Sequence, residues 1–260
     1  MRRASGPTAP GFWHNLFCMA SGKFPANAGA SVWLRLSPAR AGHPCPHSCL
    51  LFLALGLSVF ARAQETAVVT FTLDFPGSEP SHYSISVSSD GHSSYDSDGK
   101  LSPDSEADPF HLDFSVSPGT RKTIFDLAKR ARYFQGEIDS KKRGLASTGA
   151  KTLTYRDAER SATATFNYSP IVAVQQVTQL FQNLSTTLEY GRRLQYFHRY
   201  QKLALDEELK HMEEMANQNS LEELAAVAPI LQQIASDSSV INPVRARAQR
   251  MVERVGSVKR

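Results

Sequence analysis

The chain has 260 residues, with 29 Lys and Arg against 25 Asp and Glu, so its formal net charge is +4. A basic excess favours nucleic acid or an anionic surface as a partner, yet residues 1–63 contain six of the bases and no acid, and the remainder carries 4 − 6 = −2. This distribution removes the case for a nucleic-acid partner. All three cysteines also lie before residue 64, which excludes disulfides and cysteine metal sites within the rest of the chain.

Residues 49–60 form a run of twelve mostly apolar residues, followed by Ala61-Arg62-Ala63. A bilayer core requires about 20 apolar residues, so this run is too short to span a membrane, but it fits the apolar region of a secretory signal peptide. Ala61 and Ala63 supply the small residues of a cleavage site. We therefore predict that residues 1–63 are a leader and that the mature protein begins near Gln64. It would be exported to the periplasm or beyond the cell, with no membrane span left after cleavage.

The first predicted strands follow the leader. Apolar and polar residues alternate over 67–75 and again over 83–87, as in strands with one buried face. A three-residue loop with Gly91 in the left-handed conformation would set Ile85 opposite Tyr95 and keep the apolar residues on one face. A two-residue loop would instead pair Tyr95 with Ser86, so the pattern favours the longer loop.

The rest of residues 64–169 continues as a sheet with one helix. A fourth strand is predicted over 110–116, with Phe110, Leu112, Phe114 and Val116 on its buried face. A helix begins at residues 117–120 and ends near 133–134, and an exposed loop follows over 141–149. A second hairpin spans 151–168. We therefore expect about six strands, mostly antiparallel, with one packed helix.

Residues 170–260 are predicted to be helical, which makes the fold class α+β. A buried seam of five apolar residues steps by three and four along the first helix and loses its phase at Gly191: Val174, Val177, Phe181, Leu184 and Leu188. Further helices should start at Asp206, at a capping box of Ser220 with Glu223, and at Pro243 after an N-cap at Asn242. Four or five helices would form a small bundle or a short helical-repeat stack.

The last 35 or so residues resemble a single HEAT-type helical repeat. The resemblance rests on Pro229 in the first helix, Asp237 at the turn, and Val244-Arg245 with Ala248 in the second helix. It implies that Arg245 reaches Asp237 and that the pair stacks on the helix of residues 206–215, because such repeats bury their faces only against neighbours. Within the pair, four apolar residues of the first helix should bury against four of the second: Leu224, Val227, Leu231 and Ile234 against Val244, Ala248, Met251 and Val255. An ordinary capped helical hairpin would share most of this pattern. The chain from residue 64 onwards also resembles exported bacterial proteins of unknown function that have hairpins followed by helices, a likeness that implies no activity.

Carboxylates gather in the polar loop over 96–108, which contains five acids. Asp96, Asp98 and Asp104 are the candidate ligands for calcium, which requires six to eight oxygen ligands. The residue order does not match an EF-hand, and a solvated acidic loop explains the composition as well. We therefore predict no cofactor for this chain.

Charge is divided unevenly after the leader. Residues 64–116 hold ten acids and one base, a net −9, and residues 117–260 hold fifteen acids and twenty-two bases, a net +7. Attraction between the two segments, or between two copies of the chain, would explain this division. The partners that we expect are therefore another envelope protein or the chain itself.

Catalytic motifs are weak in this sequence. Residues 144–152 contain two glycines and a lysine, but Ala150 separates Gly149 from Lys151 and the segment continues into a strand, unlike a phosphate-binding loop. The histidines do not have metal-binding spacing, and the serines do not occur in a nucleophile elbow. We interpret the protein as an exported binding or scaffolding protein of the bacterial envelope. The alternative is a secreted hydrolase whose active site is assembled from distant positions.

Overall fold

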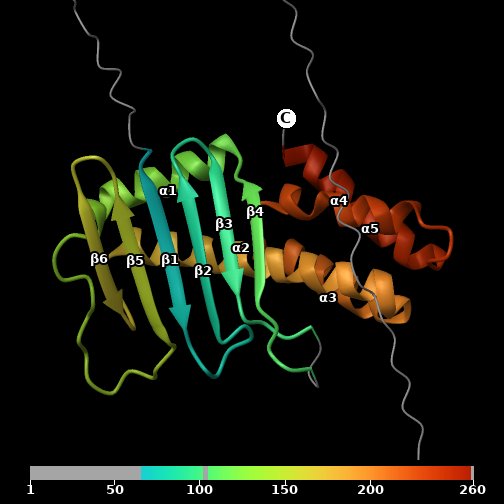
Figure 1. Ribbon diagram of the computed structural model, residues 1–260, viewed down its shortest axis with the longest axis horizontal. Coiled ribbons are helices and arrows are strands. Elements are labelled where there is room, and N and C mark those ends of the chain that lie inside the picture. Colours follow the sequence, from blue (N-terminus) through green and yellow to red (C-terminus); the bar gives the residue numbers. More distant parts are fainter. Residues whose placement is uncertain (1–65, 102–104, 259–260) are drawn as a thin grey trace, which may run out of the picture. The chain divides into compact units, whose positions relative to one another are not determined.

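The computed structural model describes residues 66–101 and 105–258. These residues have an α+β fold, in which an antiparallel six-stranded sheet is followed by a helical region (Figure 1). The predicted leader, its apolar run and the cleavage site before Gln64 lie outside the described residues, and so does Asp104. Within the described ranges, no helix combines the length and the apolarity that crossing a membrane requires.

The strands are β1 (Val68–Asp74), β2 (His82–Ser88), β3 (His92–Ser97), β4 (Phe110–Ser115), β5 (Ala150–Arg156) and β6 (Ser161–Phe166). They lie in the order β4-β3-β2-β1-β5-β6, and all neighbours are antiparallel. The predicted hairpin register is confirmed, because Ile85 lies opposite Tyr95 and Val87 opposite Ser93. Gly91 has a φ of 100°, a conformation that glycine adopts without the steric cost of a side chain.

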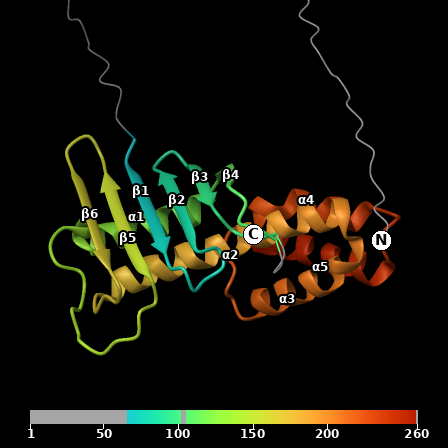
Figure 2. The same ribbon diagram turned by 60° about the horizontal axis from the view of Figure 1, so that its bottom comes forward.

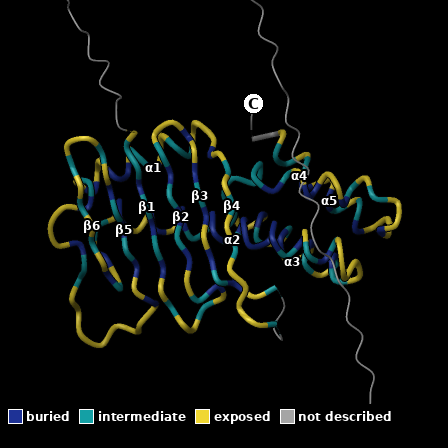
Figure 3. Tube along the Cα trace, in the orientation of Figure 1, coloured by how far each residue is buried: buried dark blue, intermediate teal, exposed yellow. Residues whose placement is uncertain are grey.

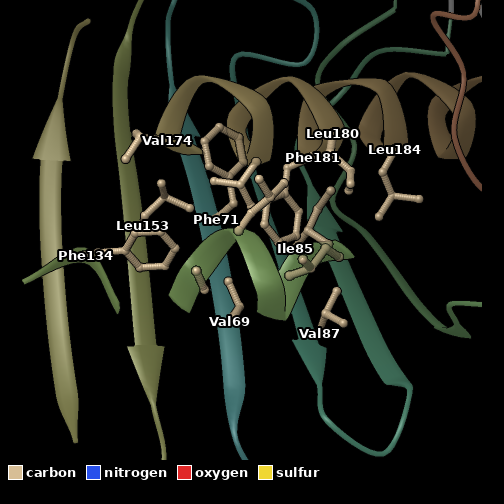
Figure 4. Packing of buried hydrophobic residues seen from close by; sticks show 14 of the residues in the cluster. Val69, Phe71, Ile85, Val87, Phe134, Leu153, Val174, Leu180, Phe181 and Leu184 are labelled. Atoms are coloured by element: carbon tan, nitrogen blue, oxygen red, sulfur yellow. The ribbon is translucent and has the colours of Figure 1, made fainter. Parts of the chain in front are cut away.

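Helices α1 (Pro118–Arg130) and α2 (Val172–Tyr200) cover one face of the sheet (Figure 1). α1 begins where predicted, because the Ser117 hydroxyl accepts a hydrogen bond from Thr120 N at 3.2 Å. A short 3-10 turn, η1 (Arg132–Phe134), follows it. Figure 4 shows Phe71 of β1 and Phe181 of α2 within this core, and their rings stack with centroids 5.5 Å apart.

The predicted burial of β4 is only partly correct. Val116 is buried, but Phe110, Leu112 and Phe114 are half-buried. The physical reason is that β4 is an edge strand with a neighbour on one side only.

The other face of the sheet is lined by serine and threonine. The side-chain oxygens of Thr70 and Ser86 lie 2.9 Å apart across β1 and β2, and those of Thr154 and Thr163 lie 3.1 Å apart across β5 and β6. None of the described helices covers this face in Figure 1. Cross-strand hydroxyl pairs of this kind support the strand register without burying apolar surface.

Beyond α2, the chain forms η2 (Lys202–Ala204), α3 (Leu205–Asn217), α4 (Leu224–Ser236) and α5 (Asn242–Val258). α2 continues through Gly191 without a break, so its first part packs on the sheet and its last part packs against α3 and α4 (Figure 2). Figure 3 marks the buried residues of these helices in dark blue. A second apolar cluster, separate from the core under the sheet, fills the space between them. The predicted helical region after the sheet is confirmed.

Three local predictions in the helical region are wrong. Ser220 and Glu223 do not form a capping box, because Glu223 is itself the residue before α4 and has a left-handed backbone with φ 52°. Arg245 donates to Asn242 and does not reach Asp237, which contacts His198 and Lys202. α5 begins at Asn242 itself, one residue before the predicted start.

The predicted packing of α4 on α5 is confirmed only in its centre. Val227, Leu231 and Ile234 are buried, as are Val244, Ala248 and Met251. Leu224 and Val255, at the outer end of the pair, are half-buried and line a cavity. Whether the pair is a HEAT repeat stays a prediction.

Candidate binding cavity beside the first helix

A cavity lies where the N-terminus of α1 meets α2, α4 and α5. Its volume is about 760 Å³, which falls in the usual range of small-molecule sites, roughly 300 to 1,000 Å³. We call it the junction cavity. Its lining consists of Ser117, Pro118, Gly119, Thr120, Thr123, Leu180, Leu221, Glu222, Glu223, Leu224, Ala225 and Val255.

Gly191 brings one wall of the junction cavity into place. A Cβ atom on Gly191 would lie only 2.5 Å from Cγ1 of Val227, a distance that real Cβ atoms do not tolerate. The absence of a side chain therefore lets α4 approach α2 closely. This approach carries the start of α4, with residues 221–225, to the side of α2 that faces α1.

Two hydrogen bonds anchor the segment before α4. Glu222 N donates to Oγ1 of Thr187 on α2 at 3.1 Å, and Glu223 Oε1 accepts from Ser117 N beside α1 at 3.0 Å. The left-handed backbone at Glu223 is uncommon for a residue with a side chain and costs on the order of 1 to 3 kcal/mol. The segment is therefore held from both sides in a strained conformation, a feature that is frequent at binding sites.

The two carboxyl groups of the junction cavity differ in their surroundings. The Glu223 carboxylate lies at the N-terminus of α1, where the helix dipole and the Ser117 N–H favour negative charge. Glu222 is half-buried, and its burial, reinforced by the nearby Glu223 charge, raises the pKa of its carboxyl group above the usual range. The ionised form of Glu222 is therefore the one that a proton or a cationic ligand would stabilise most.

The remaining walls of the cavity are mainly apolar, and their large apolar residues are Leu180, Leu221, Leu224 and Val255. A largely apolar cavity with a few convergent polar groups and a perturbed carboxyl group is the typical form of a ligand site. The hydroxyl groups of Thr120 and Thr123 add polar contacts at one edge. The arrangement suits a ligand with an apolar body and a positively charged head.

A second polar cluster lies under the sheet, at the centre of α2. Glu189 Oε1 accepts hydrogen bonds from Tyr95 OH at 2.8 Å and Ser97 Oγ at 2.6 Å. Its other oxygen is 3.7 Å from Nη1 of Arg192, and the two side chains are only 5% and 4% exposed. Burial, followed by the nearby Glu189 charge, raises the pKa of the Tyr95 phenol. The cluster ties β3 to α2.

Arg192 also joins the acidic and basic segments of the chain. Its Nη2 donates to the backbone oxygen of Asp108 at 2.7 Å and lies 3.3 Å from the Asp108 carboxylate. The guanidinium also lies over the ring of Phe110, 5.0 Å from its centroid. One ion pair between the two segments is thus present, joining the buried Arg192 to the exposed Asp108.

The calcium candidates do not meet in a described metal site. Asp96 lies on β3 with one oxygen 2.6 Å from His111 Nδ1, and Asp98 accepts hydrogen bonds from Ser81 Oγ and His82 N. In the part of the chain that the structure describes, no cluster of three or more His, Cys, Asp or Glu residues suits a metal ion. Because Asp104 lies outside that part, the three calcium candidates stay untested as a set.

The lysine of residues 144–152 has a structural role. Lys151 is in β5, and its Nζ donates to Thr148 O at 3.0 Å, Thr148 Oγ1 at 2.7 Å and Asn167 O at 3.0 Å. Its burial lowers the pKa of the ammonium group. Three neutral oxygens occupy its donors, so Lys151 is not presented to a phosphate.

Sequence reasoning missed the junction cavity, since it assigned Glu223 to a helix cap and did not single out Glu222. The available signal was the pattern Leu221-Glu222-Glu223-Leu224, in which two acids lie between leucines just before a helix. It also missed Glu189 and Arg192, which lie three residues apart at the point where the apolar seam loses its phase. No protein-family model matches the chain, and no curated protein matches it significantly.

Proposed function

We propose that the protein is a binding protein of the bacterial envelope and that it holds an amphipathic, positively charged molecule in the junction cavity. The observation that carries this proposal is the half-buried Glu222 carboxyl group, whose pKa is raised, in an apolar cavity of about 760 Å³. Such a group is stabilised when a cation replaces the water that burial has removed.

The sign of the ligand charge follows from the lining. Glu222 and Glu223 both lie in the cavity, whereas its lining includes no Lys, Arg or His. The positive end of the α1 dipole is already met by the Glu223 carboxylate. An anionic head would therefore face two carboxylates, while an ammonium group would face the Glu222 carboxyl group, whose pKa no cation among residues 66–101 and 105–258 is found to lower.

A secreted hydrolase remains the other function to weigh, and the cluster around Glu189 is its best location. Ser97 Oγ donates to Glu189, but Ser97 is buried and the same carboxylate oxygen also accepts from Tyr95. A nucleophile has to reach its substrate. The geometry of this cluster therefore fits a structural role better than a catalytic one.

Calorimetric titration with three ligands of equal chain length tests the proposal. Dodecylamine, dodecanol and dodecanoate share an apolar chain and differ in the charge of the head, and each is used below its micelle concentration. We expect dodecylamine to bind most tightly and dodecanoate most weakly. The affinity for dodecylamine should rise as the pH increases above 4.5, the ordinary pKa of the Glu222 carboxyl group, because its ammonium head binds the ionised carboxylate.

Two variants sharpen this test. Glu222→Gln should lower the affinity for dodecylamine about tenfold, since a charge-assisted hydrogen bond contributes roughly 1.5 to 3 kcal/mol, and should leave dodecanol unchanged. Glu207→Gln removes an exposed carboxylate of α3 and serves as the matched control. Equal binding of dodecylamine and dodecanoate, or no binding of any of the three, would refute the proposal.

A further inference from the structure

Two turns lie together at the end of the helical region away from the sheet (Figures 1 and 2). One is the turn around η2, between α2 and α3, and the other joins α4 to α5. Lys202 Nζ on the first turn donates to Asp237 Oδ2 on the second at 2.7 Å, and Nε2 of His198 lies 2.9 Å from the same oxygen. We call residues 198–204 and 237–245 the distal tip.

The distal tip exposes three large apolar side chains. Leu203 is 90% exposed, Tyr200 62% and Ile241 57%. The adjacent residues Leu205 and Val240 are buried in the helical core. The three exposed side chains therefore do not take part in that core. All three lie on two turns that the Lys202–Asp237 contact joins, and exposed apolar side chains on neighbouring segments are typical of an interaction site.

The charges of the distal tip have one predominant sign. It contains three bases, Arg199, Lys202 and Arg245, and one acid, Asp237, a formal net charge of +2. The guanidinium of Arg199 lies over the ring of Tyr200, 5.2 Å from its centroid. Asp237 is already engaged by Lys202 and His198. Three further acids follow the tip in the first turn of α3, and each has a basic partner: Asp206 pairs with Arg247, Glu207 with His211 and Glu208 with Arg193.

We propose that the distal tip docks on an anionic lipid surface, with Leu203 and Ile241 entering the boundary of the acyl chains. Tyr200 would lie at the level of the headgroups, where amphipathic aromatic side chains are favoured. Arg199, Lys202 and Arg245 would meet the phosphates, since basic residues beside apolar ones are the composition of peripheral membrane anchors. The tip consists of the two turns that connect α2 to α3 and α4 to α5. It can therefore touch a surface without any movement of the sheet or of the junction cavity. This proposal does not depend on the ligand of that cavity.

Vesicle co-sedimentation of the full chain tests the proposal. The vesicles are phosphatidylcholine with or without phosphatidylglycerol, and the apolar residues 49–60 contribute the same background to every variant. We expect tighter binding to the anionic vesicles. Leu203→Ser with Ile241→Ser should weaken this binding about tenfold or more, because burial of even one leucine side chain changes an equilibrium by that factor.

Two further variants complete the test, one as a control and one to test the charge. Val172→Ser alters a residue that is 58% exposed at the opposite end of α2, about 42 Å away at 1.5 Å per residue, and should bind like the wild type. Arg199→Gln should reduce binding to the anionic vesicles and leave binding to neutral ones unchanged. Both tip serines are at exposed positions, so near-ultraviolet circular dichroism should show that the variants are folded.

Three results would overturn the proposal. The first is undiminished vesicle binding by the Leu203→Ser and Ile241→Ser variant. The second is equal binding to anionic and neutral vesicles. The third is a monomer-to-dimer equilibrium that depends on Leu203 and occurs without vesicle binding, which would assign the tip to a second copy of the chain.

Discussion

The two parts of α2 use the same helix in different surroundings. From Val174 to Leu188 its buried residues follow a regular seam and belong to the core under the sheet. From Tyr190 onwards the buried residues belong to the core of the helical region. One continuous helix therefore contributes to both cores, and the sheet and the helical region are joined without a flexible linker.

The transition between the two parts explains why the apolar seam loses its phase. Residues 187–192 are all buried, so the helix is enclosed on every side there, whereas a helix lying on a sheet is enclosed on one. Such a position requires a small residue, Gly191, where α4 comes close, and it tolerates the charges of Glu189 and Arg192 only because they are paired with each other. The buried residues at this point are set by neighbours on several sides and not by one repeating face.

The largest expected effect breaks the buried pair at this transition. Arg192→Met leaves the Glu189 carboxylate buried without its cation, and removal of one partner of such a pair costs about 3 to 5 kcal/mol. Urea denaturation should show a lower free energy of unfolding by that amount. The double variant Glu189→Gln and Arg192→Met should recover part of the loss. Lys122→Met, which removes the exposed partner of Asp126, is the control and should cost less than about 1 kcal/mol. A small effect of Arg192→Met would show that the pair does not help to hold β3 and the segment around Asp108 on α2.

A smaller effect should follow when the close approach of α4 is blocked. Gly191→Ala places a methyl group against Val227, and overpacking of this kind costs about 1 to 3 kcal/mol, although alanine favours a helix over glycine by about 1 kcal/mol. We expect a net loss of unfolding free energy and weaker binding in the junction cavity. Adding Val227→Ala should restore much of the binding, and a failure to do so would separate Gly191 from the formation of the cavity.

The distal tip should show a pH-dependent stability. Hydrogen bonds from Lys202 and Ser239, followed by His198, hold the pKa of the Asp237 carboxyl group well below its ordinary value of 3.8. A depressed carboxyl pKa contributes stability above pH 3.8 that is lost as the pH falls below it. Asp237→Asn should therefore lower the melting temperature at pH 7, and the difference from the wild type should shrink below pH 3.8. A difference that is the same at both pH values would contradict the ion pairs of the tip.

The smallest effect concerns the junction cavity without a ligand. The pKa of Glu222 is raised above 4.5 in the folded protein, so the wild type should lose stability as the pH rises from 4.5 through the folded pKa. Glu222→Gln lacks this loss and should be more stable at pH 7, by about 0.5 kcal/mol or less. Thermal melts of both proteins at pH 4 to 8 would measure it. If Glu222→Gln were less stable than the wild type at pH 7, the folded protein would stabilise the ionised carboxylate of Glu222, which would contradict this prediction.

The features that the sequence predicts well are those set by local patterns. The alternation of apolar and polar residues predicted the buried faces of β1 and β2. The requirement that apolar residues share one face selected the correct loop length at Gly91. The cap at Ser220 was mispredicted because tertiary hydrogen bonds, from Glu222 N to Thr187 and from Ser117 N to Glu223, direct the chain before α4. These bonds join residues 35 and 106 positions apart, so no local pattern contains them.

The candidate site was hidden for the same reason. Its lining combines the start of α1, one residue of α2, the start of α4 and Val255 near the end of α5. Leu224 and Val255 have the spacing of core residues, and they were predicted to bury against each other. They line a cavity because the start of α4 is held toward α1 and α2.

The most direct test of the account is to map where dodecylamine binds. Two-dimensional NMR spectra of the ¹⁵N-labelled protein, recorded during titration with this ligand, report which backbone amides change their surroundings. We predict chemical-shift changes confined to the junction cavity, with Thr120, Thr123, Glu222, Ala225 and Val255 among the residues affected. The Glu222→Gln variant should need about ten times more ligand for the same changes. Changes that gather on the serine and threonine face of the sheet or at the distal tip, or the absence of any saturable change, would contradict the proposed site.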